Sequence, residues 1–394
     1  MNARSSSYVR RTTVPPENWR LPLISRLDIE LTERCNNNCI HCCINRPLHD
    51  DGARAQEMPT SRIKEILTEA ASLGTLTVRF TGGEPLIRED FEELYLYARR
   101  LGLRVCLFTN GRLITPGLAA LFVRVPLREV IEITVYGMTQ ESYESVSGVK
   151  GSYEECRRGI DLLLENDVPF IVKGSVLPQN ISEVPLFEDW ATAIPAMDSP
   201  PSYPVILDLR SRRDLPRKNQ LIKSLRLSPE EAVAFLSRDQ ERYRRSMAEF
   251  CAGFMGPSGD RLFSCGSGVG GCCVDATGRL QPCLLLRHPD VTCDLASGSL
   301  KTAMTEFFPK VREMKAENPD YLARCARCFL GGLCEQCPAK SWSEHGTLDT
   351  PVEYLCEVAH CQARDLGLLK EGEMGWEVSD WKQRVSDLVK KAGN

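Results

Sequence analysis

Short apolar runs alternate with amphipathic stretches from about residue 25 to residue 240. In the stretches between the runs, apolar residues recur at helical spacing, as they do over Ile63–Ala70 and Tyr153–Leu164. Parallel strands need long crossover connections, which are usually helices, so this alternation predicts a parallel sheet. The predicted strands are Ser25–Leu31, Leu76–Thr81, Leu103–Thr109, Glu129–Tyr136, Phe170–Leu177 and Tyr203–Leu209.

Six strand–helix units are fewer than the eight of a closed barrel, so the pattern predicts an α/β fold with a partial (β/α)6 TIM-like barrel. Helical patterns at 228–250 and 375–394 lie on either side of a cysteine-rich stretch. We expect an N-terminal extension over 1–24, the barrel over 25–240, a small cysteine-rich domain over 241–365 and a helical tail over 366–394.

Composition limits the function classes. The chain has 394 residues and a net charge of −4, which gives no electrostatic case for binding nucleic acid. Met1–Arg20 lacks the apolar core of a secretory signal, and no apolar run approaches the length of a membrane span. We therefore expect a cytoplasmic protein without membrane or nucleic-acid partners. In a reducing cytosol, clustered cysteines, here among eighteen, favour metal ligation over disulfides.

Cys35, Cys39 and Cys42 form a C-x3-C-x2-C cluster after the first predicted strand. Three thiolates at this spacing can hold three corners of a [4Fe–4S] cluster, leaving one iron open to a small molecule. The alternative is a zinc site, with Cys43 or His41 as the fourth ligand.

Other chemistry-bearing segments also follow predicted strands. Gly82-Gly83-Glu84-Pro85 follows the second strand, Asn110 follows the third and Gly137 the fourth. In βα barrels the chemistry lies at the C-terminal ends of the strands, so these segments are expected to meet at one site. Two glycines there let the backbone approach a ligand closely.

The cysteine cluster, followed by Gly-Gly-Glu-Pro some 40 residues later, resembles the signature of the radical S-adenosylmethionine (SAM) superfamily. The resemblance implies a partial barrel in which the open iron binds SAM and the Gly82–Pro85 segment contacts the SAM amino group. It implies cleavage of SAM to a 5′-deoxyadenosyl radical, which abstracts a substrate hydrogen. It places further SAM contacts at His41, Asn110, Thr134 and Lys173.

The downstream cysteines resemble the SPASM extension of radical SAM proteins, although the gap between Cys334 and Cys337 is two residues where the family has three. That resemblance implies two auxiliary [4Fe–4S] clusters, and the alternative is a pair of zinc sites. Cys361 competes with Cys356 for the last position. The implied ligands are Cys265, Cys283, Cys337 and either Cys272 or Cys273 for one cluster, and Cys325, Cys328, Cys334 and Cys356 for the other.

SPASM proteins mostly modify peptides, so the resemblance implies a peptide maturase that crosslinks, oxidises or epimerises its substrate. Only 24 residues precede the first predicted strand, which is too few for a fused leader-binding domain. We therefore expect either a separate leader-binding protein as a partner or a substrate that needs none. A flavodoxin or ferredoxin is expected to donate the electron.

Three alternatives to a peptide maturase remain. One is the modification of a small molecule or a tetrapyrrole side chain. Sulfatase-type maturation is the second, but Leu284 follows Cys283 where those enzymes carry an aspartate base. The third is a non-catalytic electron carrier, which would not need an open iron.

A basic stretch, with Arg210, Arg212, Arg213, Arg217 and Lys218, follows the last predicted strand. We interpret it as a solvated connection, the alternative being a site for an acidic peptide or for the SAM carboxylate.

Overall fold

The computed structural model describes residues 24–392, which divide into two compact units. The barrel unit comprises residues 24–225 and 266–309, and the C-terminal unit comprises 226–265 and 310–392. Each unit is therefore built from two separate pieces of chain. Within the described residues, no helix is both long enough and apolar enough to cross a membrane.

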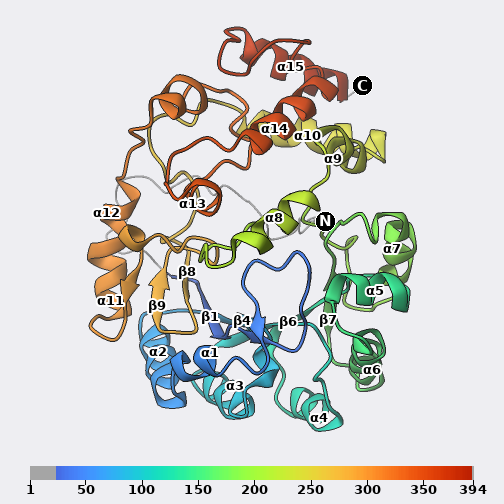
Figure 1. Cartoon of the computed structure of the whole chain (residues 1–394), viewed down its shortest axis with the longest axis vertical. Helices are drawn as coiled ribbons and strands as arrows, with labels where there is room; N and C mark the ends of the chain where they lie inside the picture. The colour runs from blue at the N-terminus through green and yellow to red at the C-terminus, as the bar shows by residue number, and fades with distance from the viewer. Residues whose placement is uncertain (1–23, 393–394) are drawn as a thin grey trace. The chain divides into compact units, whose positions relative to one another are not determined.

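The barrel unit is built on an eight-stranded sheet of order β10-β9-β8-β1-β4-β5-β6-β7 (Figure 1). The six neighbours from β8 to β7 pair in parallel, whereas β9 and β10 extend the sheet antiparallel at one edge. The strands are β1 Arg26–Thr32, β4 Thr77–Gly82, β5 Arg104–Thr109, β6 Arg128–Thr134, β7 Phe170–Lys173, β8 Gly271–Val274, β9 Arg279–Gln281 and β10 Cys293–Asp294. A second, two-stranded sheet joins β2 Arg34–Cys35 and β3 Arg46–Pro47.

Helices α2, α3, α4 and α6 follow one another along the outer side of the sheet (Figure 1). Each buries an apolar stripe, such as Ile63, Ile66 and Leu67 of α2, because apolar residues recur every three to four positions. This arrangement confirms the predicted α/β partial barrel. The helical segments of this unit are α1 Asp51–Gln56, α2 Thr60–Ser72, η1 Pro85–Ile87, α3 Phe91–Arg100, α4 Pro116–Arg124, α5 Gln140–Ser147, α6 Ser152–Glu165, η2 Ile181–Glu183, α7 Val184–Thr192, α8 Pro216–Ser224, η3 Pro289–Val291, α11 Leu300–Thr302 and η4 Ala303–Phe307. The boundary between the units falls within α12, Phe308–Arg312.

The sixth parallel strand differs from the prediction. Tyr203–Leu209 forms no strand, because Pro201 and Pro204 lack the amide hydrogens that a ladder needs. The chain here keeps only an isolated bridge between Lys173 of β7 and Ser202. Beyond β7, the Gly174 amide donates to Ser202 O and the Val176 amide donates to Pro204 O. The sixth place is taken by β8, which pairs with the opposite edge of the sheet, along β1.

The two faces of the strands differ in polarity. On β1, Leu27, Ile29 and Leu31 face the helices, whereas the intervening Asp28, Glu30 and Thr32 point to the other face. All six are buried. Asp28 forms an ion pair with Arg79 of β4, so the inner face of the sheet is lined with paired charges.

The C-terminal unit is helical. Its elements are α9 Pro229–Leu236, α10 Gln240–Phe254, η5 Tyr321–Cys325, α13 Pro338–His345, α14 Glu353–Asp365 and α15 Trp381–Ala392. The predicted helix over 228–250 is two helices, since Asp239 begins a new one by accepting a hydrogen bond from the Arg242 amide. The tail helix starts at Trp381 rather than Gly375 and packs against α10.

Candidate functional site

The three cysteines of the first cluster lie on the connection between β1 and α1, here called the cysteine loop, which includes the short strands β2 and β3. Cys35 and Cys39 are buried and Cys42 is half-buried. Backbone amides already point at two sulfurs: Asn37 N–H donates to Cys35 Sγ at 3.4 Å, and Asn45 N–H donates to Cys42 Sγ at 3.4 Å. Amide donors of this kind stabilise thiolates, the form in which cysteine binds metal.

The Gly82–Pro85 segment docks directly onto this loop. The Gly83 amide donates to Thr32 O at 2.7 Å, and the Glu84 amide donates to Arg34 O at 2.9 Å. A Cβ atom on Gly82 would lie 2.1 Å from Thr32 O, and one on Gly83 would lie 2.1 Å from Arg34 O. Only glycine permits this approach, and Gly82 also has a φ of +129°.

Glu84 and Asn110 connect the same loop to the end of β5. The fully buried Glu84 carboxylate accepts hydrogen bonds from the Thr109 hydroxyl at 2.8 Å and the Asn110 amide at 2.7 Å. Burial raises the pKa of Glu84 to about 7, although these donors oppose it. The Asn110 side chain donates to Asn36 Oδ1 at 2.7 Å and to Cys35 Sγ at 3.8 Å. The predicted residues after β1, β4 and β5 therefore meet at one place.

Arg112, which no motif in the sequence marks, holds the cysteine loop in place by hydrogen bonds from the turn that follows β5. Its guanidinium donates to Asn37 Oδ1 at 2.6 Å and to the backbone carbonyl of Asn36. Glu155 of α6 fixes the other side of the guanidinium at 2.7 Å. No local pattern marks Arg112, because its partners lie more than 40 residues away.

His41 packs edge-on against Tyr136, with ring centroids 5.6 Å apart. Burial, with a smaller contribution from Lys218, lowers the pKa of His41 to about 4, so its imidazole is neutral at physiological pH. Its Nδ1 atom is buried without a hydrogen-bond partner. An unpartnered buried nitrogen beside the cysteine loop is suited to receive a bound group.

The two predicted SAM contacts Thr134 and Lys173 lie at the ends of β6 and β7 rather than on the cysteine loop. Thr134 and Lys173 lie opposite each other in the sheet. The Lys173 ammonium pairs with Glu132 at 3.1 Å and lies 3.4 Å above the centre of the Phe108 ring. Lys173 thus has partners on the inner face of the barrel.

The interpretation of the basic stretch as a solvated connection is wrong for Arg210 and Lys218, whereas Arg213 and Arg217 are exposed. Arg210 is only 1% exposed, binds Asp214 at 2.7 Å and donates to Asn45 O at 3.2 Å. Lys218 donates to Cys39 O at 2.6 Å. These residues therefore hold the cysteine loop from the side of α8, which explains why the cations cluster here in the sequence.

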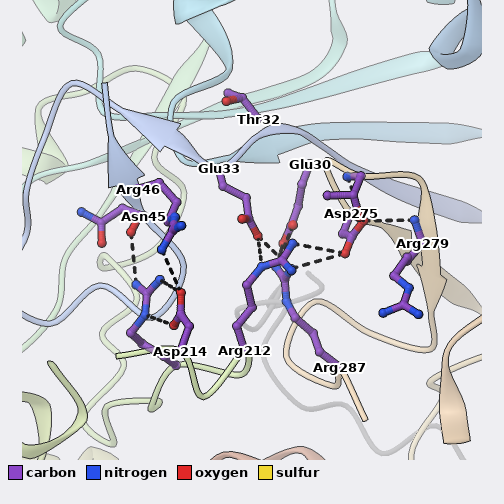
Figure 2. Close-up of polar contacts among 12 residues, drawn as sticks. Glu30, Thr32, Glu33, Asn45, Arg46, Arg212, Asp214, Asp275, Arg279 and Arg287 are labelled. Atoms are coloured by element: carbon purple, nitrogen blue, oxygen red, sulfur yellow. Dashed lines mark hydrogen bonds and ion pairs between the residues drawn. The ribbon is translucent and has the colours of Figure 1, made fainter. Parts of the chain in front are cut away.

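A buried group of charges lies beside the loop (Figure 2). Arg287 donates to Glu30 at 2.7 Å and to Glu33 at 2.9 Å, and Arg212 also pairs with Glu33 (Figure 2). Asp275 lies 3.5 Å from Arg287. Burial alone would lower the pKa of Arg287, but the three carboxylates outweigh it and raise that pKa. The network ties the start of the cysteine loop to the segments that follow β8 and Cys283.

Four cysteines of the C-terminal unit face one cavity of about 40 Å³. That volume exceeds the ~10–15 Å³ that one water molecule needs. Apolar Leu330, Val352 and Trp376 line the same cavity. Cys361 lines a separate surface groove. The four cavity cysteines are Cys325, Cys328, Cys334 and Cys356.

The remaining predicted ligands are divided between the units. Cys265 and Cys337 belong to the C-terminal unit, where burial and, less strongly, the charge of Cys265 raise the pKa of Cys337. Cys272, Cys273 and Cys283 belong to the barrel unit. On β8, Cys272 lies opposite Leu27 and Cys273 opposite Asp28, so their side chains point to opposite faces of the sheet.

The residues present fit the predicted groups. Three thiols share one loop with amide donors, and a backbone cradle made by two glycines lies beside them. Four further thiols share one cavity, as the four ligands of a complete [4Fe–4S] cluster should. Among residues 24–392, no three cysteine, histidine or acidic side chains are arranged to hold a single metal ion.

Comparisons with known proteins agree with this arrangement. Residues 29–191 match the Radical SAM superfamily. The chain is 26% identical to an AdoMet-dependent heme synthase of Methanosarcina barkeri over 361 residues, which cover 84% of this chain and 94% of the synthase. It is 34% identical to a PqqA peptide cyclase of Gluconobacter oxydans over 157 residues, 40% of this chain and 42% of the cyclase.

A solved structure, "Native anSMEcpe with bound AdoMet", superposes with a TM-score of 0.58. The superposition covers 93% of this chain and 99% of that one at 13% identity, and therefore shows a shared fold. Another structure of that protein, with bound AdoMet and Cp18Cys peptide, gives 0.54. Members of the superfamily use a [4Fe–4S] cluster and SAM. The chain is therefore an enzyme, and its residues 29–191 form a radical SAM domain.

Proposed function

We propose that this enzyme holds its SAM-binding [4Fe–4S] cluster on Cys35, Cys39 and Cys42 and abstracts a hydrogen atom from a peptide substrate. The observation that carries the site is the docking of Gly83 and Glu84 onto the cysteine loop through two backbone hydrogen bonds. When reduced, such a cluster supplies the electron that splits SAM into methionine and a 5′-deoxyadenosyl radical.

The protein residues have separate tasks in this proposal. The Gly82–Pro85 backbone receives the SAM amino group. His41 is neutral, packs edge-on against Tyr136 and borders the adenine. Asn110 and Arg112 keep the loop in place. Thr134 and Lys173 face the ribose and carboxylate end of SAM. Burial lowers the pKa of Lys173, and the contact with Glu132 opposes that shift.

The C-terminal unit has an auxiliary role in the proposal. Cys325, Cys328, Cys334 and Cys356 hold one auxiliary cluster, for which the shared cavity is the support. Cys265, Cys283, Cys337 and Cys272 or Cys273 hold a second one, for which the SPASM-like spacing is the support. A flavodoxin or ferredoxin donates electrons, and a separate leader-binding protein presents the substrate.

Two comparisons support a peptide as the substrate. Over 157 residues, the chain is 34% identical to a peptide cyclase. The fold over 93% of the chain is that of a protein solved with a bound peptide. The finer chemistry proposed is a crosslink, an oxidation or an epimerisation.

A second substrate class is favoured by one observation. The AdoMet-dependent heme synthase aligns over almost its whole length, including the part that lies outside the radical SAM domain. We therefore retain modification of a tetrapyrrole side chain as the second candidate.

One experiment separates the two. The enzyme is incubated anoxically in D2O with SAM, a reductant and either the short peptide encoded nearest its gene or Fe-coproporphyrin III. A peptide maturase yields a peptide that has lost two hydrogens or gained one deuterium. A tetrapyrrole enzyme leaves that peptide unchanged and alters the mass of the porphyrin. Formation of 5′-deoxyadenosine without either product contradicts both assignments.

A further inference from the structure

Within the C-terminal unit, one cysteine of the cavity differs from its neighbours in its hydrogen-bond environment. The sulfur of Cys356 lies 3.5 Å from His360 Nδ1 and 3.7 Å from Arg324 Nη2. Both nitrogens belong to side chains, and both are within the distance of a hydrogen bond to sulfur. Two side-chain nitrogens therefore converge on a single thiol.

The tautomer of His360 follows from its other contact. The Gly375 amide donates to His360 Nε2 at 3.0 Å, so Nε2 is the acceptor nitrogen. In a neutral imidazole the proton must then be on Nδ1. Nδ1–H donates to Cys356 O at 2.7 Å and also lies within reach of the sulfur.

Arg324 is held in place from two sides. Glu353 accepts hydrogen bonds from both terminal nitrogens, at 2.8 and 2.7 Å. The guanidinium lies 5.0 Å from the ring centre of Trp376, which also packs edge-on against His360 at 5.4 Å. Trp376 directly follows Gly375, so this short segment before the tail helix orients both donors.

The tail segment also packs tightly on the cavity. A Cβ atom on Gly375 would lie 2.6 Å from Cys328 Sγ, and Gly375 O accepts a hydrogen bond from the Phe329 amide at 3.1 Å. The backbone of residue 375 thus fixes His360 and touches a second cavity cysteine. The tail segment is therefore held on the cavity by backbone hydrogen bonds as well as by apolar contacts.

We propose that Arg324 and His360 raise the one-electron reduction potential of the cluster assigned to Cys325, Cys328, Cys334 and Cys356. The inference rests on that part of the proposed function. Hydrogen bonds to a ligating sulfur stabilise the more negative, reduced state, and so raise the potential. The positive charge of Arg324 acts in the same direction, reduced by its pairing with Glu353. The two residues are positioning residues, since neither is a ligand.

The test uses the full-length chain with Cys35, Cys39 and Cys42 changed to alanine, which removes the signal of the first cluster. After anoxic reconstitution with iron and sulfide, the signal lost in the additional variant Cys356→Ala identifies the cluster in question. Its potential is then measured by an EPR-monitored redox titration in Arg324→Gln and in His360→Gln. Arg327→Gln is the matched control, because Arg327 is exposed and lies just after the helical segment that contains Arg324.

The expected result is an unchanged iron content and a lower potential in both variants. The equilibrium constant of reduction should fall about tenfold in Arg324→Gln, which is ~59 mV for one electron. His360→Gln should shift the potential in the same direction by less, and Arg327→Gln should not shift it.

Two results would overturn the inference, and they are distinguishable. A cluster that is present with the same potential in all three variants removes the tuning role and leaves the proposed cluster intact. If Cys356→Ala and Cys328→Ala lose neither iron nor signal, the proposed cluster itself is wrong. If Arg324→Gln fails to retain iron, the potential measured in His360→Gln still decides whether the inference holds.

Discussion

The two groups of cysteines are held in different ways. In the barrel unit, three thiols follow one short loop, which is fixed by hydrogen bonds from the ends of β4 and β5 and from α8. In the C-terminal unit, four thiols from separate turns and helices face one largely apolar cavity. The first arrangement depends on polar contacts of the backbone, and the second on the packing of helices and of the tail segment.

This difference indicates different tasks. A loop that supplies three thiols beside a glycine cradle suits a group that must also bind a ligand. A cavity that supplies four thiols suits a group that exchanges electrons but binds nothing else. Five substitutions in the chain would break or sharpen this comparison.

The largest effect is expected from the cysteines themselves. Cys35→Ala should abolish SAM cleavage, because only two of the three loop thiols remain. Cys328→Ala should retain SAM cleavage but lose the substrate product. Both are measured as 5′-deoxyadenosine and product by chromatography under anoxic conditions. Full turnover in either variant would contradict the role assigned to that cysteine.

Gly83→Ala should break the docking of the glycine segment. Its Cβ would lie 2.1 Å from Arg34 O, which is backbone and cannot turn away. Overpacking of this kind costs typically ~1–3 kcal/mol or more. We expect a lower midpoint of thermal unfolding. We also expect SAM binding, measured by equilibrium dialysis, to be lost. Gly117→Ala in α4 is the control, because the nearest atom is 3.7 Å away and alanine favours a helix.

Arg112→Gln should loosen the cysteine loop without removing a ligand. Residues that orient ligands typically contribute ~10–100-fold to metal affinity, so the iron content after dialysis against a chelator should fall. The exposed Arg158 of α6 provides the control variant Arg158→Gln. Equal iron retention in the two variants would show that the loop holds its shape without Arg112.

The last prediction concerns the ionisation of Glu84. Its folded-state pKa is about 7, above the ordinary value of 4.5, because the carboxyl is buried. The folded chain therefore binds a proton between these pH values that the unfolded chain has released. Its stability should fall as pH rises from about 4.5 to 7, by at most ~1.4 kcal/mol per pH unit, and change little above that range.

Urea unfolding of the metal-free chain at pH 5 and pH 7.5 tests this sign. Glu84→Gln, which cannot ionise, should show a smaller difference between the two pH values than the unchanged chain does. An identical difference in both chains would mean that Glu84 does not titrate in this range.

The sequence predicts the barrel well because its evidence is local. The apolar runs identify β1, β4, β5, β6 and β7 within a few residues, and the motifs at their ends meet in the structure as expected. The resemblance to the SPASM extension implies the grouping of four later cysteines, and all four line one cavity. They are Cys325, Cys328, Cys334 and Cys356.

Contacts between distant side chains leave no such pattern. Arg112, Arg210 and Arg287 are ordinary charged residues in the sequence, and their partners lie in segments with no shared period. The proline-rich segment after residue 200 has the hydropathy of a strand but lacks the amide donors. The four residues of β8 are too few to show strand periodicity, and two of them are cysteines.

The pairing of β8 with β1 has a consequence for how the chain is made. The hydrogen bond from Ser25 Oγ to Gly270 O spans 245 residues. At ~5–20 residues per second, synthesis takes roughly 10–50 s between the two strands. Throughout that interval the β8-side edge of β1 has no partner strand, and exposed edges invite pairing with other chains. A nascent chain of this enzyme should therefore depend on chaperones until residue 274 has left the ribosome, and a fragment ending at residue 240 should aggregate.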